Sequence, residues 1–332
     1  MTQSGNDPRC KDAASDRSLQ NPVFILGLHR SGTTILYEML SALKQWNTLW
    51  AWHISSYDEI RSGAVDFATS QARFMERLVR SGMETRGVDS IKVGPETKEE
   101  YCFILDNEGQ GFRLTQKSFP VFQTMCETIQ STFADERPLL LKNPWDFGNA
   151  PQIHELIPSA RFVFIHRDPR ETISSMGRLM HSVFEKPHPW LVMLSKGYHA
   201  ATQSRIKRAL MNSLVCNTPG LFMRLLTWWT ARYCDEFLKS IARLPQECFI
   251  EITYDQLCTA PNATIGRIQE KLNVPPSGID FSEMISPRHP RLDERVAARS
   301  ARIQRRMERY YQHMDAIRAC HPTAESEIRR AG

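Results

Sequence analysis

The chain has 332 residues, which is enough to bury a full hydrophobic core, and its length favours one large domain over two. Its 41% hydrophobic and 24% charged residues are ordinary for a globular protein, and its net charge of +5 is far from the dense basic charge of a dedicated nucleic-acid-binding protein. The eight cysteines include no CxxC pair, which argues against the common kind of zinc site and predicts reduced thiols in a cytoplasmic protein.

The first twenty residues are polar and carry charges of both signs, without the apolar core of a secretory signal. They predict a flexible tail over residues 1–20, followed by a single domain over 21–332 with a helical C-terminal arm. No later stretch reaches the roughly 18 to 20 consecutive apolar residues of a membrane span. We therefore expect no membrane span.

Apolar runs predict buried strands over residues 23–26, 139–141 and 161–165, and an alternating pattern predicts another over 249–254. Apolar residues at helical spacing predict helices over 34–43, 71–81, 98–105, 169–180, 221–244 and 262–272, and along an arm over 291–317. The segment 181–217 is expected to be irregular. Strands that alternate with helices predict a three-layer α/β/α fold with a central, mostly parallel sheet, whose ligands bind beyond the carboxyl ends of the strands.

The first strand leads into the segment Gly27-Leu28-His29-Arg30-Ser31-Gly32-Thr33-Thr34. Its spacing matches the phosphate-binding P-loop G-x-x-x-x-G-K-[ST], except that Thr33 occupies the lysine position. Gly27 and Gly32 let the backbone curl, so that the following amides can point at an anion, and Arg30 supplies a cation inside the loop. Further donors are the hydroxyl groups of Ser31, Thr33 and Thr34. The alternative is a glycine-containing turn that binds no ligand.

A second anion-binding motif follows the strand at 161–165 and reads HRDPRETISS from His166 to Ser175. Arg167 lies at the strand exit, and Ser175 lies about two turns into the next helix. Both side chains can reach one phosphate near the edge of the sheet where the first loop lies. A purely structural ion pair in the Arg-Asp-Pro turn is the alternative.

Together the two motifs resemble the sulfotransferases that use 3'-phosphoadenosine-5'-phosphosulfate (PAPS), and most of all their bacterial branch, whose members read GLPRSGTT, LKSP and HRDP. The likeness continues in Leu141-Lys142-Asn143-Pro144 and in the block from Ile252 to Leu257, which is similar to the family's Y-E-D-L block. It extends from about residue 23 to residue 276.

The resemblance implies a P-loop-like sulfotransferase fold and transfer of the sulfuryl group of PAPS to a hydroxyl or amine of a small-molecule acceptor, by in-line displacement and without a metal. It implies that Arg30 to Thr34 hold the 5'-phosphosulfate, Arg167 and Ser175 the 3'-phosphate, and Tyr254 the adenine. Arg30 and Lys142 are then the cations that stabilise the developing charge. Two rival hypotheses are a P-loop kinase for a small metabolite, which needs ATP and Mg²⁺, and a protein that binds PAPS without turnover.

This sequence differs from the families that it resembles at the positions where those families carry the general base. Cytosolic sulfotransferases carry a histidine two residues after the lysine, where this chain has Pro144. The bacterial branch often carries Trp-Glu some way after the loop, where this chain reads Trp52-His53. His53 is our preferred base because the pKa of histidine lies near working pH, although it can equally be a histidine packed between tryptophans. The alternatives left open are Glu99, Glu100 and Asp146.

Aromatic residues lie in the segments that family members use to shape the acceptor pocket, and the acceptor itself is not identified by the sequence. These residues are Trp46, Trp50, Trp52, Trp145, Phe184, Trp190 and Tyr198. They can hold a ring, a sugar face or a lipid tail, or belong to the core.

Overall fold

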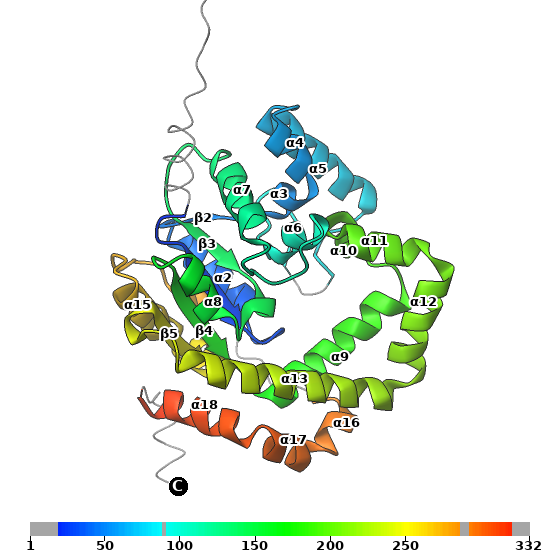
Figure 1. Cartoon of the computed structure of the whole chain (residues 1–332), viewed down its shortest axis with the longest axis vertical. Helices are drawn as coiled ribbons and strands as arrows, with labels where there is room; N and C mark the ends of the chain where they lie inside the picture. Colours follow the sequence, from blue (N-terminus) through cyan, green and yellow to red (C-terminus); the bar gives the residue numbers. More distant parts are fainter. Residues whose placement is uncertain (1–18, 88–90, 286–291, 321–332) are drawn as a thin grey trace, which may run out of the picture.

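The computed structural model describes residues 19–87, 91–285 and 292–320 (Figure 1). The tail expected over residues 1–20 lies outside the described residues except for its last two. Of these, Leu19 packs against the core, and its carbonyl oxygen accepts a hydrogen bond of 3.3 Å from Ser159 Oγ.

A five-stranded sheet with the strand order β2-β3-β1-β4-β5 forms the centre of the fold, and all its strand pairs are parallel. The strands are β1 (Val23–Gly27), β2 (Asn47–Thr48), β3 (Leu139–Lys142), β4 (Arg161–His166) and β5 (Phe249–Thr253). Successive side chains point to opposite faces, so that Phe24 and Leu26 enter one core cluster while Val23 and Ile25 enter the other. The four predicted strands are confirmed, and the short β2 was not predicted.

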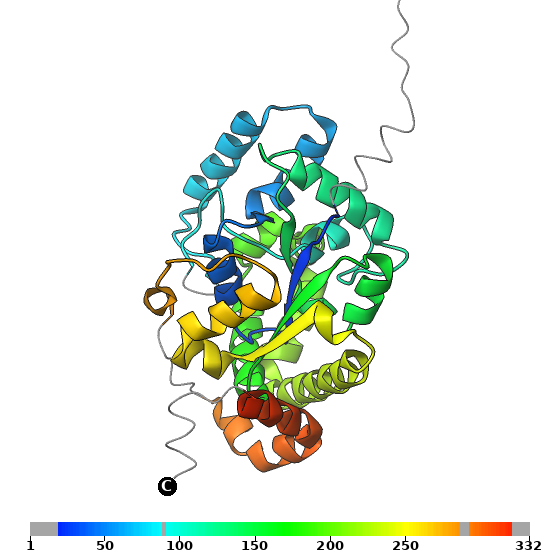
Figure 2. The same ribbon diagram turned by 90° about the vertical axis from the view of Figure 1, so that its left-hand side faces the viewer.

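Helices cover both faces of the sheet, as the edge-on view in Figure 2 shows. One face is covered by α2 (Thr33–Ala42), α14 (Tyr254–Thr259) and α15 (Pro261–Lys271). The other is covered by α7 (Phe119–Gln130), α8 (Ala150–Leu156), α13 (Pro219–Ile241) and α18 (Glu308–Cys320). This arrangement confirms the three-layer α/β/α fold.

Two further groups of helices lie outside these layers (Figure 1). Beyond β2 are α3 (Ala51–Ser55), α4 (Tyr57–Ser62), α5 (Phe67–Ser81) and α6 (Cys102–Asn107). An arch that leads from β4 to α13 consists of α9 (Pro169–Glu185), α10 (Pro189–Leu194), α11 (Lys196–Gln203), α12 (Arg205–Asn212) and the π-helical turn η2 (Ser213–Asn217). The remaining elements are the 3₁₀ turns η1 (Pro144–Asp146), η3 (Gln246–Cys248) and η4 (Phe281–Met284), with α16 (Glu294–Ala297) and α17 (Ser300–Arg306). None of the described helices has both the length and the apolar character needed to cross a bilayer.

The prediction of an irregular segment over 181–217 is wrong, because most of that segment is helical. Its prolines look like helix breakers, but Pro189 is the first residue of α10, a position where the missing N–H costs nothing. Ser195 and Ser204 cap α11 and α12 by accepting hydrogen bonds from the amides of Tyr198 and Lys207. The helix expected over 98–105 begins only at Cys102, because the backbone of Lys98 forms a bridge with Trp50.

A helical C-terminal arm was expected over 291–317, and its described part consists of the three helices α16, α17 and α18. Its first residue, Arg291, lies outside the described residues. Apolar side chains of the arm, including Tyr310 and Met314, are buried in the core cluster on the α13 side of the sheet. The arm is therefore part of the core and not a solvated surface helix.

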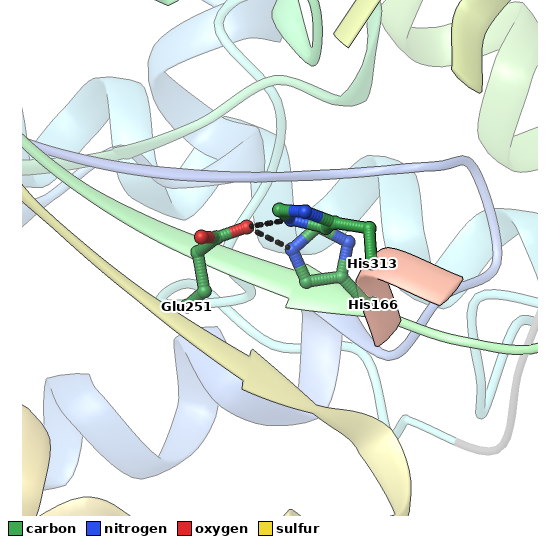
Figure 3. Close-up of side chains that lie close together, drawn as sticks. All are labelled: His166, Glu251 and His313. Carbon is green, nitrogen blue, oxygen red and sulfur yellow. Dashed lines mark hydrogen bonds and ion pairs between the residues drawn. The ribbon is translucent and has the colours of Figure 1, made fainter. Parts of the chain in front are cut away.

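Three polar side chains join α18 to the sheet: His166 of β4, Glu251 of β5 and His313 of α18 (Figure 3). The Nε2 atoms of His166 and His313 lie 3.0 and 2.6 Å from Glu251 Oε1, and His166 Nδ1 lies 2.8 Å from Tyr310 Oη. Burial by itself raises the pKa of Glu251, but the hydrogen bonds from the two histidines lower that pKa to about 2. Glu251 is therefore an ionised carboxylate that binds the arm to two strands.

We predict that Glu251→Gln lowers the free energy of unfolding at pH 7 by about 1–3 kcal/mol, because two histidines lose a charged acceptor. The carboxyl pKa is about 2 in the folded chain and near its ordinary 4.5 when unfolded, so its contribution is complete above pH 4.5 and is lost as the pH falls towards 2. The difference between wild type and variant should shrink over that interval in urea denaturation measured by circular dichroism. The exposed Glu247→Gln is the control, and equal losses in the two variants would contradict the assignment.

Candidate functional site

The loop between β1 and α2 lies where the connectivity of the sheet changes direction. From β1 the chain proceeds to β2 and β3 on one side, and β4 then pairs with β1 on the other side. The carboxyl ends of β1 and β4 therefore lie side by side, which is where ligands bind in sheets of this kind. Both predicted anion-binding motifs begin at this edge.

Backbone geometry explains the glycines of the loop. A Cβ atom on Gly27 would lie only 2.6 Å from the carbonyl oxygen of Ile165 on β4. Gly32 has a φ of 104°, and a Cβ atom there would lie 2.5 Å from Cδ2 of Tyr254. Arg30 also has a positive φ, 68°, which turns the chain sharply before α2 begins at Thr33. The loop thus closes against β4 and α14.

The structure brings together the side chains predicted from the two motifs. Arg30 Nε donates a hydrogen bond of 3.1 Å to Ser175 Oγ, and Arg167 Nη1 donates one of 3.3 Å to the backbone carbonyl of Arg30. The guanidinium of Arg167 lies 4.2 Å from the ring centre of Tyr254, and its Nε donates to Glu171 at 2.7 Å. Two guanidinium groups, a hydroxyl and an aromatic ring, from three distant parts of the chain, form one corner whose donors are of the kind that bind anions.

A cavity of about 490 Å³ opens beside this corner. The predicted residues that line it are Arg30, Gly32, Thr33, Thr34, Glu99, Glu100, Arg167 and Tyr254. Ser31 is buried beneath the loop, and its Oγ has no hydrogen-bond partner among the described residues. Ser175 lies behind Arg30, to which it is hydrogen-bonded.

Lys142, at the end of β3, is buried just behind the cavity wall. Its Nζ donates a hydrogen bond of 3.2 Å to Thr34 Oγ1 and lies 3.4 Å from Glu100 Oε1. Burial by itself raises the pKa of Glu100, but the charge of Lys142, followed by those of His29 and Arg86, more than offsets this effect and leaves the pKa lowered. The cavity floor therefore holds an ionised carboxylate beside an ammonium group.

The structure does not bring His53 to the cavity. The side chain is 1% exposed, its ring stacks on Trp50, and its Nδ1 accepts a hydrogen bond of 3.0 Å from the Trp50 amide. Its Nε2 lies 3.0 Å from Thr132 Oγ1. Burial lowers the pKa of His53 to about 3, so the ring is neutral and packed within the protein. His53 is therefore a histidine packed among tryptophans, which was the alternative to its role as a base.

The carboxylates of two other candidate bases already have hydrogen-bond partners within the protein. Asp146 is fully buried and accepts hydrogen bonds from Asn143, Asn149 and Tyr101, and burial raises its pKa to about 6. Glu99 lines the cavity, but its Oε1 lies 2.6 Å from Arg86 Nη1 and 2.8 Å from Trp190 Nε1. Glu100 is thus the candidate carboxylate that lies beside Lys142.

His29 also lines the cavity, although it was not among the site residues predicted from the sequence. Its ring packs edge-on against Trp145 at 4.7 Å, and its buried Nε2 has no hydrogen-bond partner among the described residues. Burial lowers the pKa of His29, Glu100 raises it, and Lys142 and Arg30 lower it, with a lowered pKa as the result. The imidazole is therefore neutral near pH 7. The signal in the sequence was that the resembling bacterial loop reads GLPRSGTT while this loop reads GLHRSGTT.

The cavity also has an apolar lining. It comes from α9, α10 and neighbouring segments and includes Ile91, Phe103, Phe112, Met176, Leu179, Met180, Val183 and Leu191. Of the aromatic residues expected to shape an acceptor pocket, Trp145 and Trp190 line the cavity, whereas Trp46, Trp52 and Trp50 lie in or against the hydrophobic core. Charged and apolar side chains therefore line the same cavity.

Metal-ligating side chains gather elsewhere. Among residues 19–87, 91–285 and 292–320, the one group with three potential ligand atoms is His166, Glu251 and His313. These side chains are hydrogen-bonded to one another on β4, β5 and α18, as described above. They do not line the cavity.

The sequence model of the sulfotransferase family matches residues 22–277, which include both anion-binding motifs and Tyr254. The chain belongs to the sulfotransferase family. The fold of this sulfotransferase is similar to that of STF9 from Mycobacterium avium, with a TM-score of 0.57 at 18% identity over 95% of this chain and 72% of that one. It is also similar to STF1 from Mycobacterium tuberculosis, with a TM-score of 0.50 at 16% identity over 90% and 79% of the two chains. No curated protein matches the sequence.

We predict that Gly32→Ala destabilises this sulfotransferase by about 1–3 kcal/mol, from the strain of a positive φ and from displacement of Tyr254. Gly63→Ala is the matched control, because Gly63 also has a positive φ, 64°, but no atom within 4 Å of the added methyl group. In urea denaturation, Gly63→Ala should therefore lower the free energy of unfolding by less than Gly32→Ala does. When Tyr254→Ala is already present, Gly32→Ala should lower the free energy of unfolding only about as much as Gly63→Ala. If Gly32→Ala lowered it by the same amount with and without Tyr254, the assigned contact would be contradicted.

Proposed function

We propose that this protein transfers the sulfuryl group of PAPS to the hydroxyl group of a small acceptor with an apolar body. The observation that carries the proposal is the corner of Arg30, Ser175, Arg167 and Tyr254, beside a cavity that also has an apolar lining. Family membership supports sulfuryl transfer in general. The donor nucleotide and the class of acceptor are our inference.

The corner suits a nucleotide that carries two separate anionic groups. Arg167 and Ser175 would bind the 3'-phosphate, and the ring of Tyr254 would lie beside the adenine. The loop amides from Gly32 to Thr34, at the start of α2, would bind the 5'-phosphosulfate because the first backbone N–H groups of a helix have no partner within it, whereas the amide of Ser31 donates to the carbonyl oxygen of Leu28. The small residues of the loop allow that close approach.

The reaction that we propose is an in-line displacement. The acceptor oxygen forms a bond to sulfur as the bond from sulfur to the bridging phosphate oxygen breaks, and the electron pair stays on the departing phosphate. Arg30 and Lys142 supply positive charge where negative charge develops, within a partly enclosed site where that charge is weakly screened. Thr34, hydrogen-bonded to Lys142, fixes the direction of the ammonium group.

Two side chains in the cavity, His29 and Glu100, could take up the proton that the acceptor hydroxyl loses. We assign this role to His29. Its Nε2 has no hydrogen-bond partner among the described residues and can accept a proton in the tautomer that carries hydrogen on Nδ1, whereas the carboxylate of Glu100 lies against Lys142 and has a lowered pKa. Glu100 raises the pKa of His29, so it would stabilise the imidazolium that forms when the proton arrives. His29 and Glu100 replace His53 as the proposed base and its electrostatic partner.

The first test measures binding of the product nucleotide, 3'-phosphoadenosine-5'-phosphate, by calorimetry. We expect it to bind more tightly than ADP, or than ATP with Mg²⁺, and we expect Arg167→Ala to weaken binding roughly 10- to 100-fold through loss of charge-assisted hydrogen bonds. Arg170→Ala is the matched control, because Arg170 pairs with Asp168 and does not line the cavity. Tighter Mg²⁺-dependent ATP binding that ignores Arg167 would replace the proposal with the kinase hypothesis.

The second test follows transfer from radiolabelled PAPS to long-chain primary alcohols as a function of pH. Because the pKa of His29 is lowered from its ordinary 6.5, activity should rise with pH through an apparent pKa below 6.5 and then level off. We expect His29→Ala to lower kcat/KM by about 10²- to 10⁴-fold, the usual contribution of a general base, without weakening nucleotide binding. Glu100→Gln should shift the acid limb to lower pH, because a group that raises the pKa of His29 is removed.

An acid limb that persists in His29→Ala would reject His29 as the base. Nucleotide binding without transfer to any alcohol in the wild-type protein would favour the non-catalytic hypothesis instead.

A further inference from the structure

The arch that follows α9 exposes large apolar side chains at helical spacing. On α12, Ile206 is 82% exposed and Leu210 is 71% exposed, and no residue of that helix is buried. Leu214 continues the spacing of four residues into η2 and is also exposed. A helix in a folded protein normally buries its apolar side, so this one presents an apolar ridge without a partner among the described residues.

The same exposure continues on the first half of α13. Leu221, Leu225 and Trp228 follow one another at helical spacing, and all three are about half exposed, as is Trp229. η2 joins this part of α13 to α12, and in Figure 1 the two helices meet at the edge of the molecule that lies far from the sheet. We call the exposed apolar residues of α12, η2 and α13 the outer ridge: Ile206, Leu210, Leu214, Leu221, Leu225, Trp228 and Trp229.

Positive charge surrounds the outer ridge, and negative charge is absent from its sequence. Residues 186–234 contain no aspartate or glutamate and seven basic residues: Lys186, Lys196, Arg205, Lys207, Arg208, Arg224 and Arg232. Arg205, Lys207 and Arg208 are exposed beside Ile206 and Leu210 on α12. Next to Trp228, a groove between α13 and α17 is lined by arginines, namely Arg224, Arg299, Arg302 and Arg306.

We propose that the outer ridge docks this protein on the surface of an anionic lipid bilayer. An apolar ridge with basic side chains beside it, and with tryptophan at the boundary, matches the chemistry of the interface between acyl chains and acidic headgroups. A second copy of the chain fits less well, because a two-fold contact through this ridge would bring the cations of α12 close to their own copies. Docking requires no membrane span.

The position of the ridge connects docking with the cavity. α12 and η2 pack against α9, the helix that contributes Met176, Leu179, Met180 and Val183 to the lining of the cavity. A protein seated on the outer ridge would hold this wall of the cavity near the bilayer. An apolar acceptor alcohol would then be taken from the membrane, and this last step rests on the proposed function whereas docking itself does not.

The test is co-sedimentation of the full chain with vesicles, without nucleotide or acceptor, so that its outcome is independent of catalysis. We expect binding to vesicles of phosphatidylcholine with phosphatidylglycerol, weak binding to phosphatidylcholine alone, and weaker binding as salt is added. The double variant Lys207→Glu/Arg208→Glu should weaken binding at least roughly 30-fold, from the loss of two cations near the surface. The double variant Ile206→Ser/Leu210→Ser should weaken it on the order of tenfold or more.

Val79→Ser is the matched control, because Val79 is an apolar residue of α5 that is 76% exposed and lies outside the ridge. It should bind vesicles as the wild type does, and circular dichroism checks that each variant is folded. Equal binding by wild type and both ridge variants would overturn the proposal. A wild-type dimer in light scattering that ignores vesicles, and that Ile206→Ser/Leu210→Ser dissociates, would also overturn it in favour of self-association.

Discussion

The parallel pairing of β1 with β4 is the contact on which the rest of the site depends. It places Gly27 opposite Ile165, so that the loop after β1 and the turn after β4 leave the sheet at the same point. The fit is tight enough that the loop has no room for a Cβ atom at Gly27. Arg167 can therefore reach the backbone of Arg30, and Arg30 can reach Ser175, although these residues are far apart in sequence.

Charge is concentrated in a small, poorly solvated volume around this corner. Lys142 and Glu100 lie 3.4 Å apart at its floor, and Arg86 and Glu99 lie 2.6 Å apart on its wall. The two carboxylates differ in their surroundings. Glu99 also accepts a hydrogen bond from Trp190 Nε1, whereas Lys142 and His29 lower the pKa of Glu100. Such buried pairs contribute little net stability, because desolvation offsets the attraction, but they hold charge in fixed directions where a reaction needs it.

The far side of the sheet supports the same corner from behind. His166 is the residue before Arg167, and its ring is held by Glu251 and Tyr310 in the core between β4, β5 and α18. The position of Arg167 is thereby coupled to the packing of the C-terminal arm. The arch from α9 to α12 contributes to two surfaces. Its helices α9 and α10 provide apolar residues that line the cavity, and α12 and η2 provide part of the outer ridge.

Much of the fold was evident from local sequence. Apolar runs predicted three of the five strands and an alternating pattern predicted a fourth, and the spacing of Gly27 and Gly32 predicted the tight loop between β1 and α2, because these features depend on residues that are neighbours in the chain. Helices α10 to α12 were missed because their apolar residues do not all face a core, so the usual pattern of burial was absent.

The composition of the cavity depended on tertiary structure. His53 and His29 carry the same imidazole, yet the first is stacked on Trp50 in the core, whereas the second lines the cavity with a ring nitrogen that has no hydrogen-bond partner in the described part of the chain. The sequence by itself determined the fold class, the family and the positions of the two motifs at the ends of β1 and β4. Only the tertiary structure decided which ionisable side chains share one enclosed space, because burial and the fields of neighbouring charges are set by segments that are far apart in the chain.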